Sequence, residues 1–118
     1  MPRLKVLFIC SRNQWRSPTA ERIFSGRRDI EVRSRGLSRT ARRKLAAADV
    51  SWAELIFVME DEHRERLVEG FRDALADTPV HVLDIPDEYP LMDPGLIELL
   101  RQGVEPVLEG IERTQPSP

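Results

Sequence analysis

The stretch LKVLFICSRNQWRSP, residues 4–18, determines how the rest of the chain is interpreted. Its first half, residues 4–10, is a short apolar run with β-branched and aromatic side chains, as in strands buried on both faces. A polar segment follows, and Ser17 before Pro18 then has the pattern of a helix N-cap with proline at the first helical position. The stretch therefore predicts a strand, a loop and a helix in that order.

The chain of 118 residues, 41% apolar and 32% charged, has the composition of one globular domain, which we expect at residues 1–113 with a flexible tail at 114–118. No apolar run approaches the roughly 18 to 20 residues of a membrane span, so we expect a cytoplasmic protein without a membrane partner. One cysteine cannot form an intramolecular disulfide, and with His63 and His81 it lacks the spacing of a zinc site. We expect no metal and no cofactor, and assign neither histidine a role.

Charge is distributed unevenly along the chain. Residues 1–44 hold 13 Lys and Arg against 3 Asp and Glu, whereas residues 45–118 hold 5 against 17. Because most of the basic residues are arginines, whose planar fork suits phosphate or carboxylate, the pattern indicates an anionic ligand or partner. Nucleic acid is the weakest candidate, since no nucleic-acid-binding motif accompanies the basic stretch, and a solvated, salt-bridged face is favoured there.

Beyond residue 18, apolar runs alternate with helix-like segments. Such a chain forms a parallel sheet with right-handed crossovers and helices on both faces, so the predicted fold class is α/β. The ligand crevice of such a sheet lies beyond the carboxyl ends of its strands, where we expect Cys10. Further strands are expected at 30–35, 55–59 and 80–83, and helices between Ser17 and Gly26, at 39–48, from 60 or 61 to 71, and at 94–111.

The segment from Cys10 to Ser17, which includes Arg16, most clearly indicates a chemical function. It has the pattern C-x5-R-S and lies between the first predicted strand and the first predicted helix. Backbone N–H groups wrapped between a strand end and a helix N-terminus form a cradle for an anion. The same field favours the Cys10 thiolate, and the Arg16 guanidinium fits two oxygens of a phosphoryl group. The pattern predicts a nucleophile beneath a bound tetrahedral anion. The alternative is a buried core cysteine at a strand end, beside surface arginines.

The loop resembles that of the low-molecular-weight protein tyrosine phosphatases, which reads C-x-G-N-x-C-R-S-P. The likeness extends across most of the chain, and the chain is similar to a compact bacterial branch of the family. Ser34-x-Gly36, residues 53–59 and the IPDEY stretch at 85–89 also resemble family segments. The resemblance implies a single-domain, doubly wound, four-stranded parallel sheet of order 2-1-3-4, with a phosphate-binding loop after the first strand. The matching loop residues are Cys10, Asn13, Arg16, Ser17 and Pro18.

The resemblance also implies an activity, which is hydrolysis of a phosphomonoester of the protein-tyrosine type through a phosphocysteine on Cys10. Arg16 would bind the phosphoryl oxygens, and Asp87 would act as general acid and then as general base. Ser34 would support Asn13 from outside the loop. Substrate would be a phosphotyrosine protein or a small aryl phosphate, and inorganic phosphate, sulfate or vanadate would bind the loop. The implied phosphate- or substrate-binding residues are Ser11, Arg12, Asn13, Gln14, Trp15, Ser17 and Tyr89.

Two departures from the family pattern concern the loop. Arg12 stands where the family has glycine, so it either adds an anion contact or strains the loop. Trp15 stands where the family has its second cysteine, so no disulfide with Cys10 is possible. The acid has rivals, because Asp84, Glu88 and Asp93 lie in the same region as Asp87, and Asp93 has the pattern of an N-cap for the last helix.

Two other functions fit the same pattern. One is a phosphate- or phosphoprotein-binding module whose altered loop does not catalyse. The other is arsenate reduction, which with one cysteine would require an external thiol.

Overall fold

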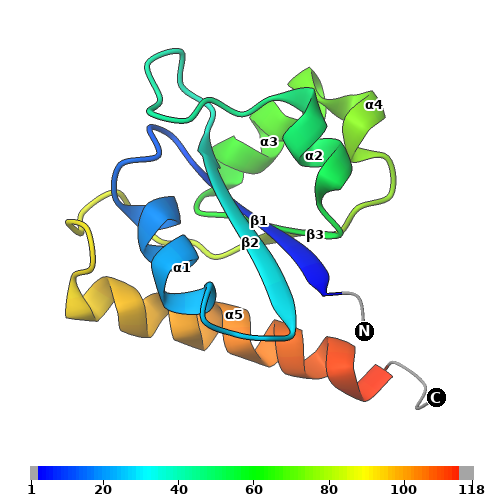
Figure 1. The fold of residues 1–118 in the computed structure, drawn as a ribbon. Coiled ribbons are helices and arrows are strands. Elements are labelled where there is room, and N and C mark those ends of the chain that lie inside the picture. The colour runs from blue at the N-terminus through cyan, green and yellow to red at the C-terminus, as the bar shows by residue number, and fades with distance from the viewer. Residues whose placement is uncertain (1–2, 115–118) are drawn as a thin grey trace.

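The computed structural model describes residues 3–114, so the predicted tail lies outside the described residues except for Thr114, which ends the last helix. Strands and helices alternate for most of this length (Figure 1). The elements are β1 (Leu4–Cys10), α1 (Arg16–Phe24), β2 (Ile30–Gly36), α2 (Ala47–Trp52), β3 (Leu55–Val58), α3 (Asp61–Gly70), α4 (Arg72–Leu75), β4 (Val80–Val82) and α5 (Pro94–Thr114).

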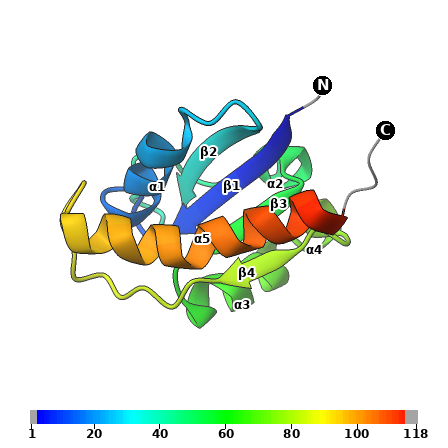
Figure 2. The same cartoon turned by 90° about the horizontal axis from the view of Figure 1, so that it is seen from below.

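The four strands form one parallel sheet of order β2-β1-β3-β4, which confirms the predicted fold class and strand order. Helices α1 and α5 lie on one side of the sheet, and α2, α3 and α4 lie on the other (Figures 1 and 2). The chain runs from β1 to β2 in one direction and then crosses to β3 on the opposite side of β1. The carboxyl ends of β1 and β3 therefore meet at the reversal of strand order, where open α/β sheets bind ligands.

Strand β1 is central because both of its faces are buried. Val6 and Phe8 belong to the core cluster under α1 and α5, whereas Leu7 and Ile9 belong to the cluster under α2 and α3. This division follows from the alternation of side chains along a strand. It explains why the β1 sequence is continuously apolar from Val6 rather than alternating.

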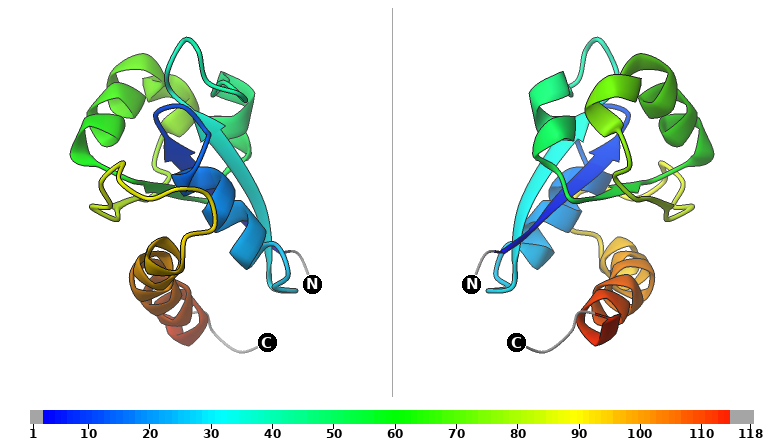
Figure 3. Two further views of the ribbon diagram at one scale, coloured as in Figure 1. Left: turned by 90° about the vertical axis from the view of Figure 1, so that its left-hand side faces the viewer. Right: turned by 90° about the vertical axis from the view of Figure 1, so that its right-hand side faces the viewer.

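Helix α5 covers the sheet face opposite α3, as the end-on views in Figure 3 show. Its inward stripe repeats every four residues, at Leu96, Leu100, Val104 and Leu108, and all four are buried. This spacing places the side chains on one face, and the helix predicted at 94–111 is confirmed. In the part of the chain that the structure describes, no helix is both long and apolar enough to cross a bilayer.

The prediction of a helix at 39–48 is wrong, because residues 37–46 form a loop and α2 begins only at Ala47. Several backbone N–H groups of this loop bond acceptors outside it. Ser38 donates to the carbonyl oxygen of Ser11 at 2.8 Å, and Arg42 donates to that of Arg12 at 3.0 Å. These contacts replace the i to i−4 bonds that a helix would make, so tertiary structure overrides the helix propensity of alanine, arginine and lysine.

The predicted start of the first helix is also wrong. Helix α1 begins at Arg16, with Trp15 before it, so Ser17 lies inside the helix and does not cap it. Pro18 is tolerated because the first four N–H groups of a helix have no intrahelical acceptor. The other boundaries lie within three residues of the expected ones, the largest difference being the end of α5 at Thr114, and an unpredicted turn, α4, follows the charged helix.

Candidate active site

The loop of residues 11–15 connects β1 to α1 at the carboxyl edge of the sheet. Cys10 is the last residue of β1 and is 3% exposed. Ser17 comes from the first turn of α1, and its Oγ lies 2.9 Å from the Cys10 Sγ. A hydroxyl at this distance can donate to a thiolate, which gives the sulfur a hydrogen-bond partner that a plain core cysteine lacks.

Asn13 gives the loop its curvature. It has a φ of 56°, in the left-handed region that asparagine tolerates better than most residues. Its side chain is buried and donates from Nδ2 to Ser17 Oγ at 2.9 Å and to Ser34 Oγ at 3.1 Å. The structure therefore joins four predicted site residues in one chain of hydrogen bonds, which are Cys10, Ser17, Asn13 and Ser34.

Arg16 is buried, with 2% of its surface exposed, and one edge of its guanidinium is held by protein. Nη1 donates to Glu60 Oε1 at 2.5 Å and to the carbonyl oxygen of Ile85 at 2.8 Å. Among residues 3–114, neither Nε nor Nη2 makes a hydrogen bond, and Nε is fully buried. Buried donors are rarely left unpaired, so this edge of the guanidinium is suited to an oxyanion.

Of the four candidate acids, Asp87 is the one that approaches Arg16. Its Oδ1 lies 3.6 Å from Arg16 Nε, and its side chain is 53% exposed. Asp84 and Glu88 are exposed in the same loop, and Asp93 Oδ2 accepts from the N–H groups of Gly95 and Leu96 at 2.9 and 3.2 Å. Asp93 is thus the N-cap of α5, as its position before Pro94 predicted.

The remaining predicted binding residues are more exposed than the buried residues of the loop. Arg12, Gln14 and Trp15 are exposed, and Trp15 is 41% exposed despite its size. Tyr89 is half-buried and packs against the core cluster under α5. The buried residues of the loop, by contrast, are engaged with one another.

His63 received no role from the sequence, yet it lies beside the loop. It is 1% exposed; its Nδ1 accepts the N–H of Glu60 at 3.1 Å, and its Nε2 is 2.9 Å from Ser11 Oγ. Because Nδ1 accepts, the proton of the neutral ring is assigned to Nε2, which donates to Ser11. Burial and the nearby charge of Arg16 lower the pKa of His63.

Two further residues belong to this network, because Arg43 Nε donates to Asn13 Oδ1 at 3.2 Å and Glu21 accepts from Arg43 and Ser34. A site role was assigned from the sequence to none of these four residues, namely Glu21, Arg43, Glu60 and His63. Glu60 and His63 follow β3 directly. Their place near Cys10 could have been predicted from the sequence, because residues just beyond the carboxyl end of a neighbouring parallel strand lie at the same edge of the sheet as Cys10. Arg43 carried no such signal, since its position depends on how the loop at 37–46 folds back.

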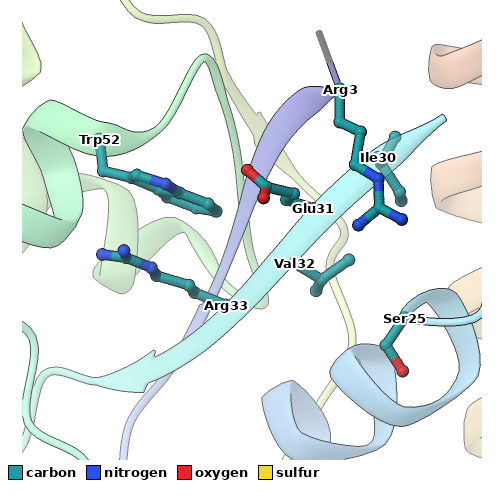
Figure 4. A pocket seen from close by; sticks show the side chains of 7 residues that line it. All are labelled: Arg3, Ser25, Ile30, Glu31, Val32, Arg33 and Trp52. Atoms are coloured by element: carbon teal, nitrogen blue, oxygen red, sulfur yellow. The ribbon is translucent and has the colours of Figure 1, made fainter. Parts of the chain in front are cut away.

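A separate groove runs along the amino-terminal half of the edge strand β2, away from these residues (Figure 4). The Arg33 guanidinium lies 4.1 Å from the centre of the Trp52 ring, a cation–π contact, and also bonds Asp49. The lining residues are Arg3, Ser25, Ile30, Glu31, Val32, Arg33 and Trp52. Within residues 3–114, no group of three or more His, Cys, Asp or Glu side chains could hold a metal ion.

The sequence matches no protein-family model, and a search of curated proteins finds no match. Solved structures do match. The low-molecular-weight phosphotyrosine phosphatase VcLMWPTP-2 of Vibrio cholerae O395 has a TM-score of 0.76 at 18% identity, covering 96% of this chain and 99% of that one. The tyrosine phosphatase Wzb of Escherichia coli K30, in complex with phosphate, has a TM-score of 0.73 at 22% identity, covering 91% and 97%.

The YwlE arginine phosphatase of Geobacillus stearothermophilus has a TM-score of 0.67 at 21% identity and covers 97% of this chain and 99% of that one. The three similar structures thus include phosphatases described for two different phosphorylated residues. Their near-complete coverage of both chains shows that this protein has the fold of the low-molecular-weight phosphotyrosine phosphatases.

Proposed function

We propose that this protein hydrolyses phosphate monoesters through a phosphocysteine on Cys10, with a phosphotyrosine protein as its substrate class. The observation that carries the proposal is the buried Arg16 Nε, which has no hydrogen-bond partner in residues 3–114 and belongs to the helix start that follows the Cys10 loop. A phosphoryl oxygen would supply the missing acceptor. The folds of the similar phosphatases support the same assignment.

In the first step the Cys10 thiolate attacks phosphorus, and the bond between phosphorus and the ester oxygen breaks. Asp87 gives its proton to the leaving oxygen, so that a neutral phenol departs. Arg16 and the loop N–H groups stabilise the charge that develops on the equatorial oxygens. Holding Nη1 on Glu60 and Ile85 aligns the other edge of Arg16 before substrate binds.

In the second step the Asp87 carboxylate takes a proton from water, which attacks phosphorus and breaks the phosphorus–sulfur bond. Ser17 Oγ, 2.9 Å from Sγ, donates to the thiolate as it leaves. The enzyme returns to its starting state with Asp87 protonated again and inorganic phosphate released. Every proton in the cycle is thus carried by Asp87 or by water.

Phosphoarginine is a second substrate candidate. The loop presents the polar side chains of Arg12 and Gln14, and the carboxylates of Asp87 and Glu88 are exposed in the loop before α5. Carboxylates near the leaving group would favour a cationic guanidinium over a phenol. The similar YwlE structure is that of an arginine phosphatase, which supports phosphoarginine as the second candidate substrate.

The test is hydrolysis of an aryl phosphate in the presence of EDTA, by the wild type, Cys10→Ser, Asp87→Asn and Asp84→Asn. We expect no turnover by Cys10→Ser and a loss of about 10²- to 10⁴-fold for Asp87→Asn, the range of a lost acid–base group. Asp84→Asn is the matched control. Its carboxylate is exposed in the same loop, and its φ of 57° suits asparagine equally well.

Each alternative gives a different result. Full activity of Cys10→Ser would contradict the mechanism, and a loss in Asp84→Asn instead of Asp87→Asn would transfer the acid role. Vanadate binding without turnover would indicate a phosphate-binding module, and arsenite release with an added thiol would indicate arsenate reduction. Faster hydrolysis of a phosphoarginine peptide than of a phosphotyrosine peptide would reassign the substrate.

A further inference from the structure

Arg43 lies in the loop at 37–46 that folds over the phosphate-binding loop. Two backbone bonds attach this segment near Arg43, one from Arg42 N–H to Arg12 O at 3.0 Å and one from Gly36 N–H to Arg43 O at 2.9 Å. The Arg43 side chain is 48% exposed, but its guanidinium reaches buried groups. Its backbone position is therefore fixed by the same loop whose side chains it contacts.

The guanidinium of Arg43 determines which way the Asn13 amide faces. An amide has a donating and an accepting end, whereas a guanidinium only donates. Arg43 Nε is 3.2 Å from Asn13 Oδ1, so the accepting end of the amide faces Arg43. The donating end, Nδ2, then faces Ser17 Oγ at 2.9 Å.

Ser34, which Arg43 also contacts, supports the same orientation. Its hydroxyl donates to Glu21 Oε1, so its oxygen can only accept from its other neighbours. Those neighbours are Asn13 Nδ2 at 3.1 Å and Arg43 Nη2 at 2.7 Å. Arg43 Nη2 also donates to Glu21 Oε1 at 2.6 Å, which holds the guanidinium over Asn13.

The orientation of Asn13 decides what the Ser17 hydroxyl does. Ser17 Oγ accepts from Asn13 Nδ2, so its own proton goes to Cys10 Sγ at 2.9 Å or to the carbonyl oxygen of Arg35 at 3.4 Å. A reversed amide would place Oδ1 against Ser17 and draw that proton away from the sulfur. Of these two acceptors, the Cys10 sulfur is the nearer to Ser17 Oγ.

We propose that Arg43 is a positioning residue that orients Asn13 and, through Asn13, directs the Ser17 hydroxyl toward the Cys10 sulfur. The proposal rests on the proposed function in taking Cys10 as the nucleophile. Arg43 stabilises the thiolate through this chain of hydrogen bonds and not merely through its charge. Glu21 contributes to this positioning, because its carboxylate holds the Arg43 guanidinium in place.

The experiment measures alkylation of Cys10, the single cysteine of the chain, by iodoacetamide from pH 5 to pH 9. It compares the wild type with Arg43→Gln, Arg42→Gln, Ser17→Ala and the double variant Arg43→Gln with Ser17→Ala. Arg42 is the matched control, since it is the adjacent arginine and its side chain is exposed. Circular dichroism and thermal unfolding verify that each variant is folded.

We expect Arg43→Gln to slow alkylation about three- to tenfold on the acidic side of the profile, the effect of one lost hydrogen bond. Arg42→Gln should match the wild type. In the Ser17→Ala background, Arg43→Gln should have no further effect, because the path to the sulfur is already broken. Arg43→Lys, which also only donates, should restore part of the rate.

Two results would overturn the proposal. One is an unchanged profile in Arg43→Gln, and the other is an equal slowing with and without Ser17, which would mean that Arg43 acts only as a nearby charge. Alkylation needs no turnover, so these results are separate from the phosphatase assay. If the protein proves to hydrolyse no phosphate ester, the proposed function fails while the thiolate measurement still decides the role of Arg43.

Discussion

The Arg16 guanidinium illustrates how a single residue is prepared for an anion. It is buried and therefore needs a partner for its charge, which Glu60 supplies from the end of β3. The ion pair with Glu60 uses Nη1 only, which leaves Nε without a hydrogen-bond partner among the described residues. Glu60 is thus expected to act on phosphate binding without contacting the phosphate.

Glu60→Gln is predicted to lower kcat/KM for an aryl phosphate about tenfold, because a misplaced guanidinium loses its alignment with the phosphoryl oxygens. Vanadate inhibition should weaken in parallel. Glu62→Gln is the control, since Glu62 is an exposed carboxylate in the first turn of α3. Equal kinetics for Glu60→Gln and the wild type would show that Ile85 O alone holds Arg16.

At the scale of elements, the sequence predicted what depends on local pattern and missed what depends on contact. Strand β1 was predictable because a strand buried on both faces must be continuously apolar. The loop at 37–46 was not, since its alanines, arginines and lysine favour a helix locally. Its N–H groups bond carbonyl oxygens of the phosphate-binding loop, a partner that no local pattern can reveal.

The end of β2 is where these two loops meet, and it has no room for a side chain. A Cβ at Gly36 would lie 2.7 Å from the Ser11 carbonyl oxygen, 3.0 Å from the Arg12 carbonyl carbon and 2.6 Å from the Ala41 Cβ. Two of these are backbone atoms of the phosphate-binding loop, so they cannot move without changing its shape.

Gly36→Ala is therefore predicted to destabilise the protein by about 1–3 kcal/mol, as overpacking does, and to weaken vanadate binding. Urea unfolding and vanadate titration measure the two effects. Gly26→Ala is the comparison, because a Cβ added at Gly26 would meet no atom within 4 Å among the described residues. Vanadate affinity equal to that of the wild type in Gly36→Ala would mean that the loop tolerates the shift.

At the scale of the molecule, the alternation of strands and helices predicted the parallel sheet and helices on both faces, and the resemblance to a known family predicted the strand order. The residues of the candidate site come from β1, α1, β2, the loop at 37–46, the end of β3 and the loop before α5. The C-x5-R-S pattern identified the loop because its residues are consecutive. Arg43 was missed because only the fold brings it to that loop, whereas the position of His63 after β3 was a signal that went unused.

The buried His63 gives the whole protein a predicted dependence of stability on pH. Its pKa is lowered in the folded state, mainly by burial, from an ordinary value of 6.5. The unfolded chain therefore binds the proton more readily, so the free energy of unfolding falls as pH drops below about 6.5 toward the folded pKa. Well above pH 6.5 the His63 ring is neutral in both the folded and the unfolded state, so the free energy of unfolding no longer loses anything to its protonation.

Urea unfolding of the wild type and of His63→Gln between pH 5 and pH 8 tests this. The stability of the wild type should decline more steeply toward pH 5 than that of His63→Gln. His81→Gln is the control for the loss of a histidine from the half-buried strand β4. Parallel curves for the wild type and His63→Gln would contradict the assignment.

The position of α5 in the chain has a consequence for biosynthesis. The sheet face that bears Val6, Phe8 and Phe57 is covered by α1 and by α5, and α5 is the last described element to be translated. At about 5–20 residues per second, its 21 residues take roughly 1–4 s to add. During that interval the nascent chain carries an apolar sheet face of the kind that chaperones shield. The order of translation, and not only the stability of the complete fold, therefore determines when this apolar sheet face is covered and no longer available for aggregation.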